Sequence, residues 1–370
     1  MRLISRHLLV AGVVLVGLAA FLDLEWLQTY RYPVAAPDFF VYYLAARIGS
    51  SQGWAAIYDP AVLLPAETAV VGRPLPYLNP PELAWLVLPL TALPYAFAAW
   101  IWRGLLATAF AVTWLVAAPG DRLSKIGCGL AGAVLLPVVM SVAFGQVSLL
   151  IIAIVAIALW LLRAKHPWLA GLVLAAVFLK PQAAFLVPIG LLLSGQLRTF
   201  VAWLAATTVL AALAVLAAGV RALVNIVTAI GVAQQVPGPT QMSLLRQLPL
   251  PLGLMSVVLA IAIFMVLAIR CRGSRPEVAV AVGLIASMLV SPYLNVYDLS
   301  GLVLAAWLVV GTNPPRWLRT VSVGIFVPIF LAPIAPLLSL VCVSGWLVTL
   351  LAISTTTTSR NAIAPAGIAA

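Results

Sequence analysis

Long apolar runs, separated by short polar or basic strings, extend over almost the whole 370-residue chain. Such runs are typical of helices that cross the hydrocarbon core of a bilayer, which takes about 20 residues each. The alternation of apolar and polar positions that a membrane barrel needs does not occur in the runs, so the pattern predicts helices. The predicted spans lie near residues 8–22, 95–117, 126–144, 147–162, 168–179, 183–195, 199–219, 254–270, 277–291, 299–311, 317–332 and 335–353.

The composition excludes a water-soluble globular domain. Hydrophobic residues make up 64% of the chain and charged residues 8%, whereas a soluble domain carries roughly 25% charged residues. The sequence predicts an all-α polytopic membrane protein, a bundle of about 11–12 transmembrane helices. Residues 1–353 are expected to form a single transmembrane domain, with 354–370 a disordered cytoplasmic tail. The first span resembles a signal peptide without a cleavage site, so we expect an uncleaved anchor.

The distribution of Lys and Arg sets the expected orientation, because cytoplasmic loops of membrane proteins are enriched in these residues. With the N-terminus inside, thirteen basic residues fall in cytoplasmic segments and six in outer ones. This bias accounts for the net charge of +11 without a nucleic-acid partner. It also favours two short spans within 168–195 that meet at Lys180-Pro181-Gln182 near the outer surface. Residues 24–94 are expected to be an outer-face loop with interfacial helices, one of them over 83–94.

One carboxylate in the loop after the first span is the leading candidate for chemistry. Asp38 stands in the string Asp38-Phe39-Phe40-Val41-Tyr42-Tyr43-Leu44-Ala45-Ala46-Arg47, in a chain with nine carboxylates in all. An acid at a membrane surface beside aromatic groups is a candidate general base, because desolvation makes it more basic. Asp38 could instead cap a helix that starts at Phe39, since Asp is a favoured N-cap residue.

Several further short strings follow the Asp38 string along the chain, in an order that is similar to that of one protein family. They are Tyr58-Asp59-Pro60, the Tyr77–Pro81 string, Gly145-Gln146, Lys180-Pro181-Gln182, Gln241-Met242-Ser243, Ser291-Pro292-Tyr293 and Tyr297-Asp298. In this order they resemble glycosyltransferase family 87. This family comprises type C membrane glycosyltransferases that depend on polyprenyl-phosphate sugars and includes mycobacterial mannosyltransferases. The resemblance extends from about residue 36 to about residue 310.

The resemblance implies a reaction at the outer face of a bacterial cytoplasmic membrane. A hexose or pentose, mannose-like, would move from a polyprenyl-phosphate donor to a glycolipid or glycan acceptor, with inversion at the anomeric carbon. Donor, acceptor and membrane lipids are the expected partners, and no cofactor is expected. No metal is expected either, because the sequence contains no HxxH or DxD string and both histidines, His7 and His166, fall on the cytoplasmic side.

The site residues follow from the resemblance and from the charges that develop in such a reaction. Asp38 is expected to take the proton of the acceptor hydroxyl. A cation must meet the charge on the leaving phosphate, and Lys180 is the first choice because its ammonium could extend from the end of an apolar run to the headgroup level. Weaker phosphate candidates are Arg47, Arg221 and Arg246. Candidates for substrate binding are Tyr42, Tyr43, Gln146, Gln182, Gln241, Tyr297 and Asp298.

Structural alternatives stand beside these roles. Lys180 could be an interface anchor, Gln146 could bond between helices, and Asp298 could pair with a nearby Arg. The tyrosines could form an ordinary interfacial belt. This chain departs from the family it resembles at one place: many relatives carry His near position 297, where this chain has Tyr297. Without that His, Asp38 would have to act as base with less help. The departure also weakens an assignment of mannose as the sugar.

Two other functions fit a polytopic protein: a transporter or flippase of lipid-linked sugars, and a non-catalytic cell-envelope assembly protein. A transporter should place ionisable groups at mid-membrane, where Arg103 alone is expected. The polar strings gather at the outer face, which favours the enzyme.

The charge distribution makes a testable prediction about topology. In a background without native cysteines, a cysteine at Ser51 or Gly238 should react with a membrane-impermeant thiol reagent on intact cells, because loops 24–82 and 220–253 are expected outside. A cysteine at Lys165 should react only after permeabilisation. Labelling of position 165 in intact cells would invert the topology and move the site to the cytoplasm.

Overall fold

The computed structural model describes residues 23, 33–72, 75–235, 242–273 and 275–352. Within these residues the regular elements are α-helices and 3₁₀ helices, without a strand, which confirms the all-α class. Three described helices are long and apolar enough to cross a membrane: α5 (Tyr95–Ala117), α11 (Leu197–Ala218) and α14 (Leu250–Arg270). Because other apolar helices are shorter, the count of about 11–12 crossings stays a prediction. The predicted first span and C-terminal tail lie outside the described residues.

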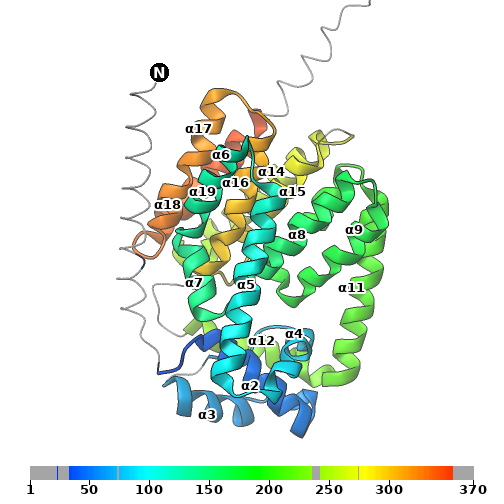
Figure 1. Cartoon of the computed structure of the whole chain (residues 1–370), viewed down its shortest axis with the longest axis vertical. Helices are drawn as coiled ribbons and strands as arrows, with labels where there is room; N and C mark the ends of the chain where they lie inside the picture. Colours follow the sequence, from blue (N-terminus) through cyan, green and yellow to red (C-terminus); the bar gives the residue numbers. More distant parts are fainter. Residues whose placement is uncertain (1–22, 24–32, 73–74, 236–241, 274, 353–370) are drawn as a thin grey trace, which may run out of the picture.

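The predicted first outer loop folds into short helices that gather at one end of the molecule (Figure 1). They are α2 (Pro37–Gln52), the 3₁₀ helix η1 (Trp54–Tyr58), α3 (Pro60–Val71), α4 (Pro81–Val87) and the 3₁₀ helix η2 (Leu88–Ala92). Proline begins α2, α3 and α4, at the position where its missing N–H costs no helical hydrogen bond. Together, α4 and η2 correspond to the helix expected over 83–94.

Several predicted spans are interrupted. Helices α6 (Arg122–Ala133) and α7 (Leu136–Phe144) meet at a bend of 59°. Helix α9 (Pro167–Leu174) continues as the 3₁₀ helix η3 (Ala175–Leu179) and stops at Lys180, whose φ of −150° and ψ of 77° are not helical. The 3₁₀ helix η4 (Pro181–Ala183) then leads to α10 (Leu186–Leu193). The predicted interruption at Lys180 is therefore confirmed.

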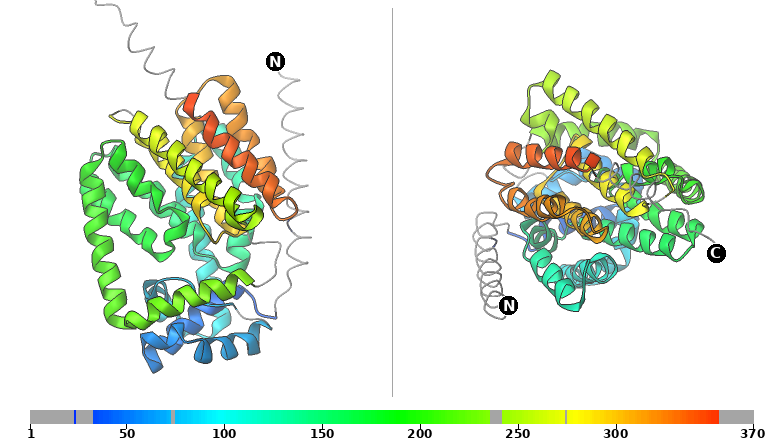
Figure 2. Two further views of the ribbon diagram at one scale, coloured as in Figure 1. Left: turned by 180° about the vertical axis from the view of Figure 1, so that it is seen from behind. Right: turned by 90° about the horizontal axis from the view of Figure 1, so that it is seen from above.

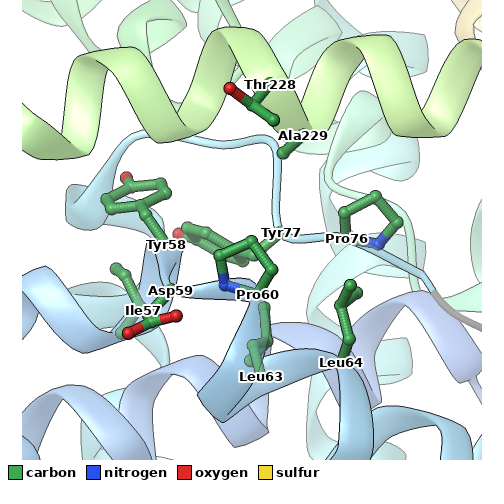
Figure 3. A pocket seen from close by; sticks show the side chains of 10 residues that line it. All are labelled: Ile57, Tyr58, Asp59, Pro60, Leu63, Leu64, Pro76, Tyr77, Thr228 and Ala229. Atoms are coloured by element: carbon green, nitrogen blue, oxygen red, sulfur yellow. The ribbon is translucent and has the colours of Figure 1, made fainter.

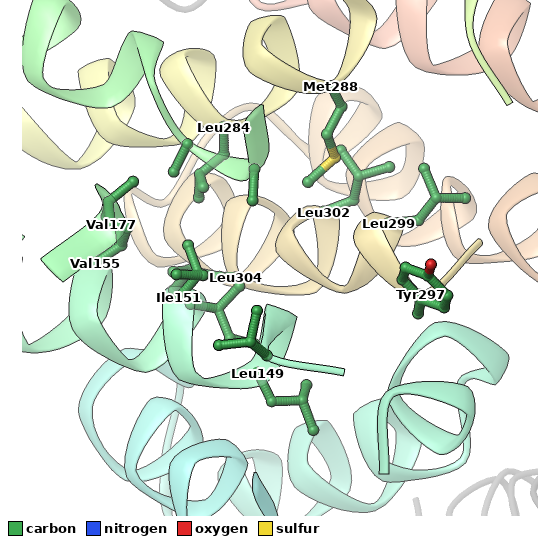
Figure 4. Close-up of a cluster of buried hydrophobic side chains, with 14 of the residues drawn as sticks. Leu149, Ile151, Val155, Val177, Leu284, Met288, Tyr297, Leu299, Leu302 and Leu304 are labelled. Atoms are coloured by element: carbon green, nitrogen blue, oxygen red, sulfur yellow. The ribbon is translucent and has the colours of Figure 1, made fainter. Parts of the chain in front are cut away.

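The centre of the bundle is formed by α15 (Pro276–Val290) and α16 (Ser300–Gly311), which are buried along nearly their whole length. Both are apolar all round, as a fully buried helix is. Helix α8 (Ser148–Arg163) packs against both of them, and α10 packs against α15. Figure 4 shows part of this core, which brings together Leu149, Ile151, Val155, Val177, Leu284, Met288, Leu299, Leu302 and Leu304. The chain continues through α17 (Arg316–Gly324), α18 (Phe326–Phe330) and α19 (Pro336–Thr349).

The predicted outer loop 220–253 contains two helices that the sequence analysis did not foresee, α12 (Val220–Gln235) and α13 (Leu244–Gln247). Figures 1 and 2 show α12 lying crosswise to α11, over the end of the molecule that α2, α3 and α4 form. Gly219, with a φ of 77°, makes the turn between α11 and α12. The polar residues of this segment lower its hydropathy below that of a span, so its pattern predicts a loop although it folds into helices.

Candidate active site

Polar side chains meet inside the bundle where four interruptions between helices come together. The four are the start of α2, the turn 145–147 between α7 and α8, the break at Lys180, and the loop that leads from α15 into the 3₁₀ helix η5 (Val296–Leu299). Non-helical backbone within a membrane bundle is tolerated where it is buried in protein or lines a cavity. The breaks therefore place polar groups inside an otherwise apolar core.

Lys180 is at the centre of this cluster. Its ammonium lies 2.5 Å from Oδ1 of Asp298 and donates to Oε1 of Gln146 at 2.9 Å and to Oγ of Ser148 at 3.1 Å. It also lies 4.7 Å from the ring centroid of Tyr297, a cation–π distance. An ammonium has three N–H donors, and these three acceptors can engage all of them.

This environment corrects three expectations. Lys180 is only 3% exposed, so the predicted extension of its ammonium to the headgroup level is wrong. Asp298 pairs with this lysine and not with an arginine. Arg103 is not the only ionisable residue inside the bundle, because Lys180 and Asp298 are also buried in it. The physical reason is that a buried charge is tolerated when it is paired and hydrogen-bonded.

Asp298 is held by a hydroxyl from another segment and by the backbone of its own loop. Its Oδ1 accepts from the Ser148 hydroxyl at 2.9 Å, and its Oδ2 accepts from the backbone N–H of Asn295 at 3.0 Å. The Asn295 side chain donates to the hydroxyls of Tyr293, at 3.1 Å, and Tyr297, at 2.6 Å. Asn295 and Asp298 form a reciprocal capping box at the start of η5. The loop is thus ordered by the same carboxylate that pairs with Lys180.

Gln146 links this buried pair to Asp38. Its Oε1 accepts from Lys180 and from the Tyr42 hydroxyl, the latter at 2.9 Å, while its Nε2 donates to Oδ2 of Asp38 at 2.9 Å. Gly145 allows the close approach, since a Cβ there would lie 2.6 Å from the Cβ of Phe39. Gln146 does bond between helices, but its partners are a lysine, a tyrosine and a carboxylate.

Asp38 is the half-exposed end of the chain of contacts, whereas Gln146 and Tyr42 are buried. Burial raises the pKa of Asp38 to about 6, against the opposing effects of the Gln146 hydrogen bond and the Lys180 charge. Helix α2 begins at Pro37 with Ala36 as its N-cap residue. The alternative in which Asp38 caps a helix starting at Phe39 is therefore wrong, and the carboxylate turns to Gln146 instead.

The comparison with protein families agrees with the sequence resemblance. A model of glycosyltransferase family 87 matches residues 77–292, more than half of the chain. The chain belongs to glycosyltransferase family 87. It is a membrane glycosyltransferase, a conclusion that favours the enzyme over the transporter and the assembly protein. No curated protein and no solved structure matches it.

The matched segment includes Gln146 and Lys180, whereas Asp38 and Asp298 lie outside it. In this glycosyltransferase the hydrogen-bond network connects these four residues to one another. Of the predicted residues it brings together Asp38, Tyr42, Gln146, Lys180, Tyr297 and Asp298. Their roles in the reaction stay predictions.

Other predicted residues of the glycosyltransferase lie apart from this network. The Tyr43 hydroxyl donates to the carbonyl of Leu93 at 2.9 Å and fastens α2 to the end of η2. Arg47 and Arg221 are exposed on α2 and α12, and Gln182 lies in η4. Arg246 is exposed on α13. Gln241 lies outside the described residues.

Three members of the network, Ser148, Tyr293 and Asn295, were not predicted as site residues. All three stand in polar strings that interrupt apolar runs, 145–148 and 291–298. Their place in a polar string is the signal by which the sequence could have identified them. The sequence does not show that the two strings meet, because they lie far apart along the chain. Among the described residues no group of three or more His, Cys, Asp or Glu side chains could hold a metal ion.

A small cavity lies where α12 covers the outer-loop helices. Its volume is about 30 Å³, and Figure 3 shows Thr228 and Ala229 of α12 opposite Tyr58, Pro60 and Tyr77. This volume is enough for about one or two water molecules and too small for a sugar. Asp59, at the edge of the cavity, caps α3 by accepting from the N–H of Ala61 at 2.9 Å.

The buried pair predicts a characteristic pattern of stability. Lys180→Met or Asp298→Asn should lower stability by about 3–5 kcal/mol, because each single change leaves one buried charge unpaired. The double variant should recover much of the loss. Arg163→Met is the control, because it breaks the more exposed Arg163–Glu277 pair, worth about 0–1 kcal/mol. Thermal midpoints in detergent measure the effect, and equal losses in the Lys180 and Arg163 variants would contradict it.

Proposed function

We propose that this glycosyltransferase moves a sugar from a polyprenyl-phosphate donor to a glycolipid or glycan acceptor on the outer face of the membrane, with Asp38 as general base. The observation that carries the proposal is the connection from the buried Lys180–Asp298 pair through Gln146 to the half-exposed carboxylate of Asp38. A base must be held in position and still be accessible to the acceptor hydroxyl. Asp38 meets both conditions.

The proposed reaction is a single displacement. The acceptor hydroxyl gives its proton to Asp38 as its oxygen forms a bond to the anomeric carbon. The bond between that carbon and the phosphate oxygen breaks, and the electron pair leaves with the lipid phosphate. Attack from the face opposite the leaving group inverts the anomeric configuration. The bond from Gln146 occupies one carboxylate oxygen of Asp38, which leaves the other oxygen to receive the proton.

In this proposal Lys180 is a positioning residue. Its three donors are engaged by Asp298, Gln146 and Ser148, which supports a role in orienting Gln146 more than a contact with phosphate. Tyr297 accepts from Asn295 and packs beside the ammonium. Tyr297 therefore helps to hold the network in place. In this proposal the proton is transferred to Asp38 and not to Tyr297.

The finer assignments rest on the resemblance and on charge distribution. A hexose or pentose, mannose-like, and inversion are what the resemblance implies. The outer-face location follows from the Lys and Arg bias. Transport of lipid-linked sugars is less well supported, because Lys180 and Asp298 neutralise each other within the protein.

The base assignment predicts the effect of removing the charge on Asp38. Asp38→Asn should retain the fold and reduce transfer at least about 100-fold, the lower limit typical of losing a general base. Transfer from a radiolabelled polyprenyl-phosphate sugar to membrane glycolipids measures it, per folded molecule. Asp59→Asn is the matched control, another outer-loop carboxylate, whose role is to cap α3. Near-normal transfer by the Asp38 variant would end the assignment.

The raised pKa of Asp38 predicts the pH dependence. Asp38 is a base only when it is deprotonated, and its pKa is raised to about 6. The value of kcat/KM should therefore increase with pH through about 6, with a slope near one in logarithmic units, and level off above. The same limb in the residual activity of Asp38→Asn would assign the titration to another group.

A further inference from the structure

A second cavity opens at the surface beside the network. Its volume is about 380 Å³, which is within the range of about 300–1,000 Å³ typical of ligand pockets. It lies between α13, the start of α14 and the loop after α15. The residues that matter for its chemistry are Met242, Ser243, Leu245, Arg246, Leu250 and Tyr293.

The polar groups of this cavity suit an anion. Arg246 supplies a guanidinium, which binds phosphate oxygens in a fixed fork of donors. The Ser243 hydroxyl accepts from the backbone N–H of Arg246 at 3.2 Å, and a hydroxyl that accepts one bond still has a hydrogen to donate. Burial raises the pKa of Tyr293 to about 12, and the charges of Asp38 and Asp298 also raise it, so its phenol keeps its proton.

The rest of the lining is apolar. Met242, Leu245 and Leu250 offer hydrocarbon surface directly beside the guanidinium. A free sugar would be recognised by several polar groups around its ring, whereas this lining combines one cation and two hydroxyls with apolar side chains. The combination fits a molecule with an anionic head and a hydrocarbon chain.

The cavity and the hydrogen-bond network that ends at Asp38 share one loop. The backbone N–H of Met242 donates to the carbonyl of Leu294 at 2.5 Å, which ties the segment before α13 to the loop 291–295. In that loop Tyr293 lines the cavity and receives a hydrogen bond from Asn295, whose backbone N–H bonds to Asp298. One loop therefore forms both a wall of the cavity and the frame of the network that ends at Asp38.

We propose that this cavity binds the phosphate and the first chain carbons of a lipid phosphate, with Arg246 as the cation that meets the phosphate. The inference rests on the proposed function, in which a lipid phosphate is the leaving group. It assigns to Arg246 the phosphate contact that the buried ammonium of Lys180 does not make, in a cavity whose wall includes Tyr293 of the loop that carries Asp298.

Binding without turnover tests this assignment. The purified full chain in detergent is titrated with a polyprenyl monophosphate, the matching uncharged polyprenol, phosphatidylglycerol and inorganic phosphate, and native mass spectrometry gives the dissociation constants. The monophosphate should bind most tightly. Arg246→Gln should weaken it at least about tenfold, the loss of a hydrogen bond between charged groups, while Arg246→Lys should retain part of the affinity. Arg319→Gln, an exposed arginine on α17, is the matched control.

The outcomes separate this inference from the proposed function. Unchanged affinity in Arg246→Gln, or equal binding of the polyprenol, would overturn the phosphate assignment. Binding of phosphatidylglycerol as tight as the monophosphate, with the same dependence on Arg246, would make the cavity a general phospholipid site and also overturn it. Asp38→Asn should bind the monophosphate like the wild type. If Arg246-dependent binding occurs but no sugar is transferred, the proposed function fails while the cavity assignment stands.

Discussion

The ion pair between Lys180 and Asp298 is the interaction on which the site depends. Moving two charges out of water costs several kcal/mol for each ion and is offset only when the ions are paired and fully hydrogen-bonded. Here Ser148, Gln146 and the backbone of Asn295 supply those bonds. Because Lys180, its partners Gln146 and Ser148, and the loop of Asn295 and Asp298 belong to three separate breaks between helices, satisfying the pair fixes the breaks relative to one another.

The network divides the work of the site among residues with different exposure. Lys180 and Asp298 are only 3% and 2% exposed, so in the proposed reaction they would act through Gln146. Asp38, at the half-exposed end, is accessible to an acceptor. Arg246 lies in an open cavity on the other side of the loop that carries Asp298. In the proposed reaction, this arrangement separates the group that takes a proton from the group that meets a phosphate.

Sequence alone predicted the helical class, most of the long apolar helices and the break at Lys180, because hydropathy and proline act locally. It did not predict the bend between α6 and α7, which lies within one apolar run. It predicted six members of the network, since charged and amide groups in an apolar chain are conspicuous. It did not predict that Lys180 is buried, because its partner Asp298 lies more than a hundred residues further along the chain. It also missed α12, whose polar face gave it the composition of a loop.

The central claim is that the buried pair, acting through Gln146, holds Asp38 as a base with a pKa raised to about 6. Infrared difference titration of the purified protein labelled with carboxyl-¹³C aspartate measures this directly, without donor or turnover. The account predicts an aspartic acid band that titrates near pH 6 and is absent in Asp38→Asn. In Gln146→Leu the transition should move to higher pH, because Asp38 loses the hydrogen bond that stabilises its charged form. The account would be contradicted if Asp38→Asn removed no band that titrates near pH 6.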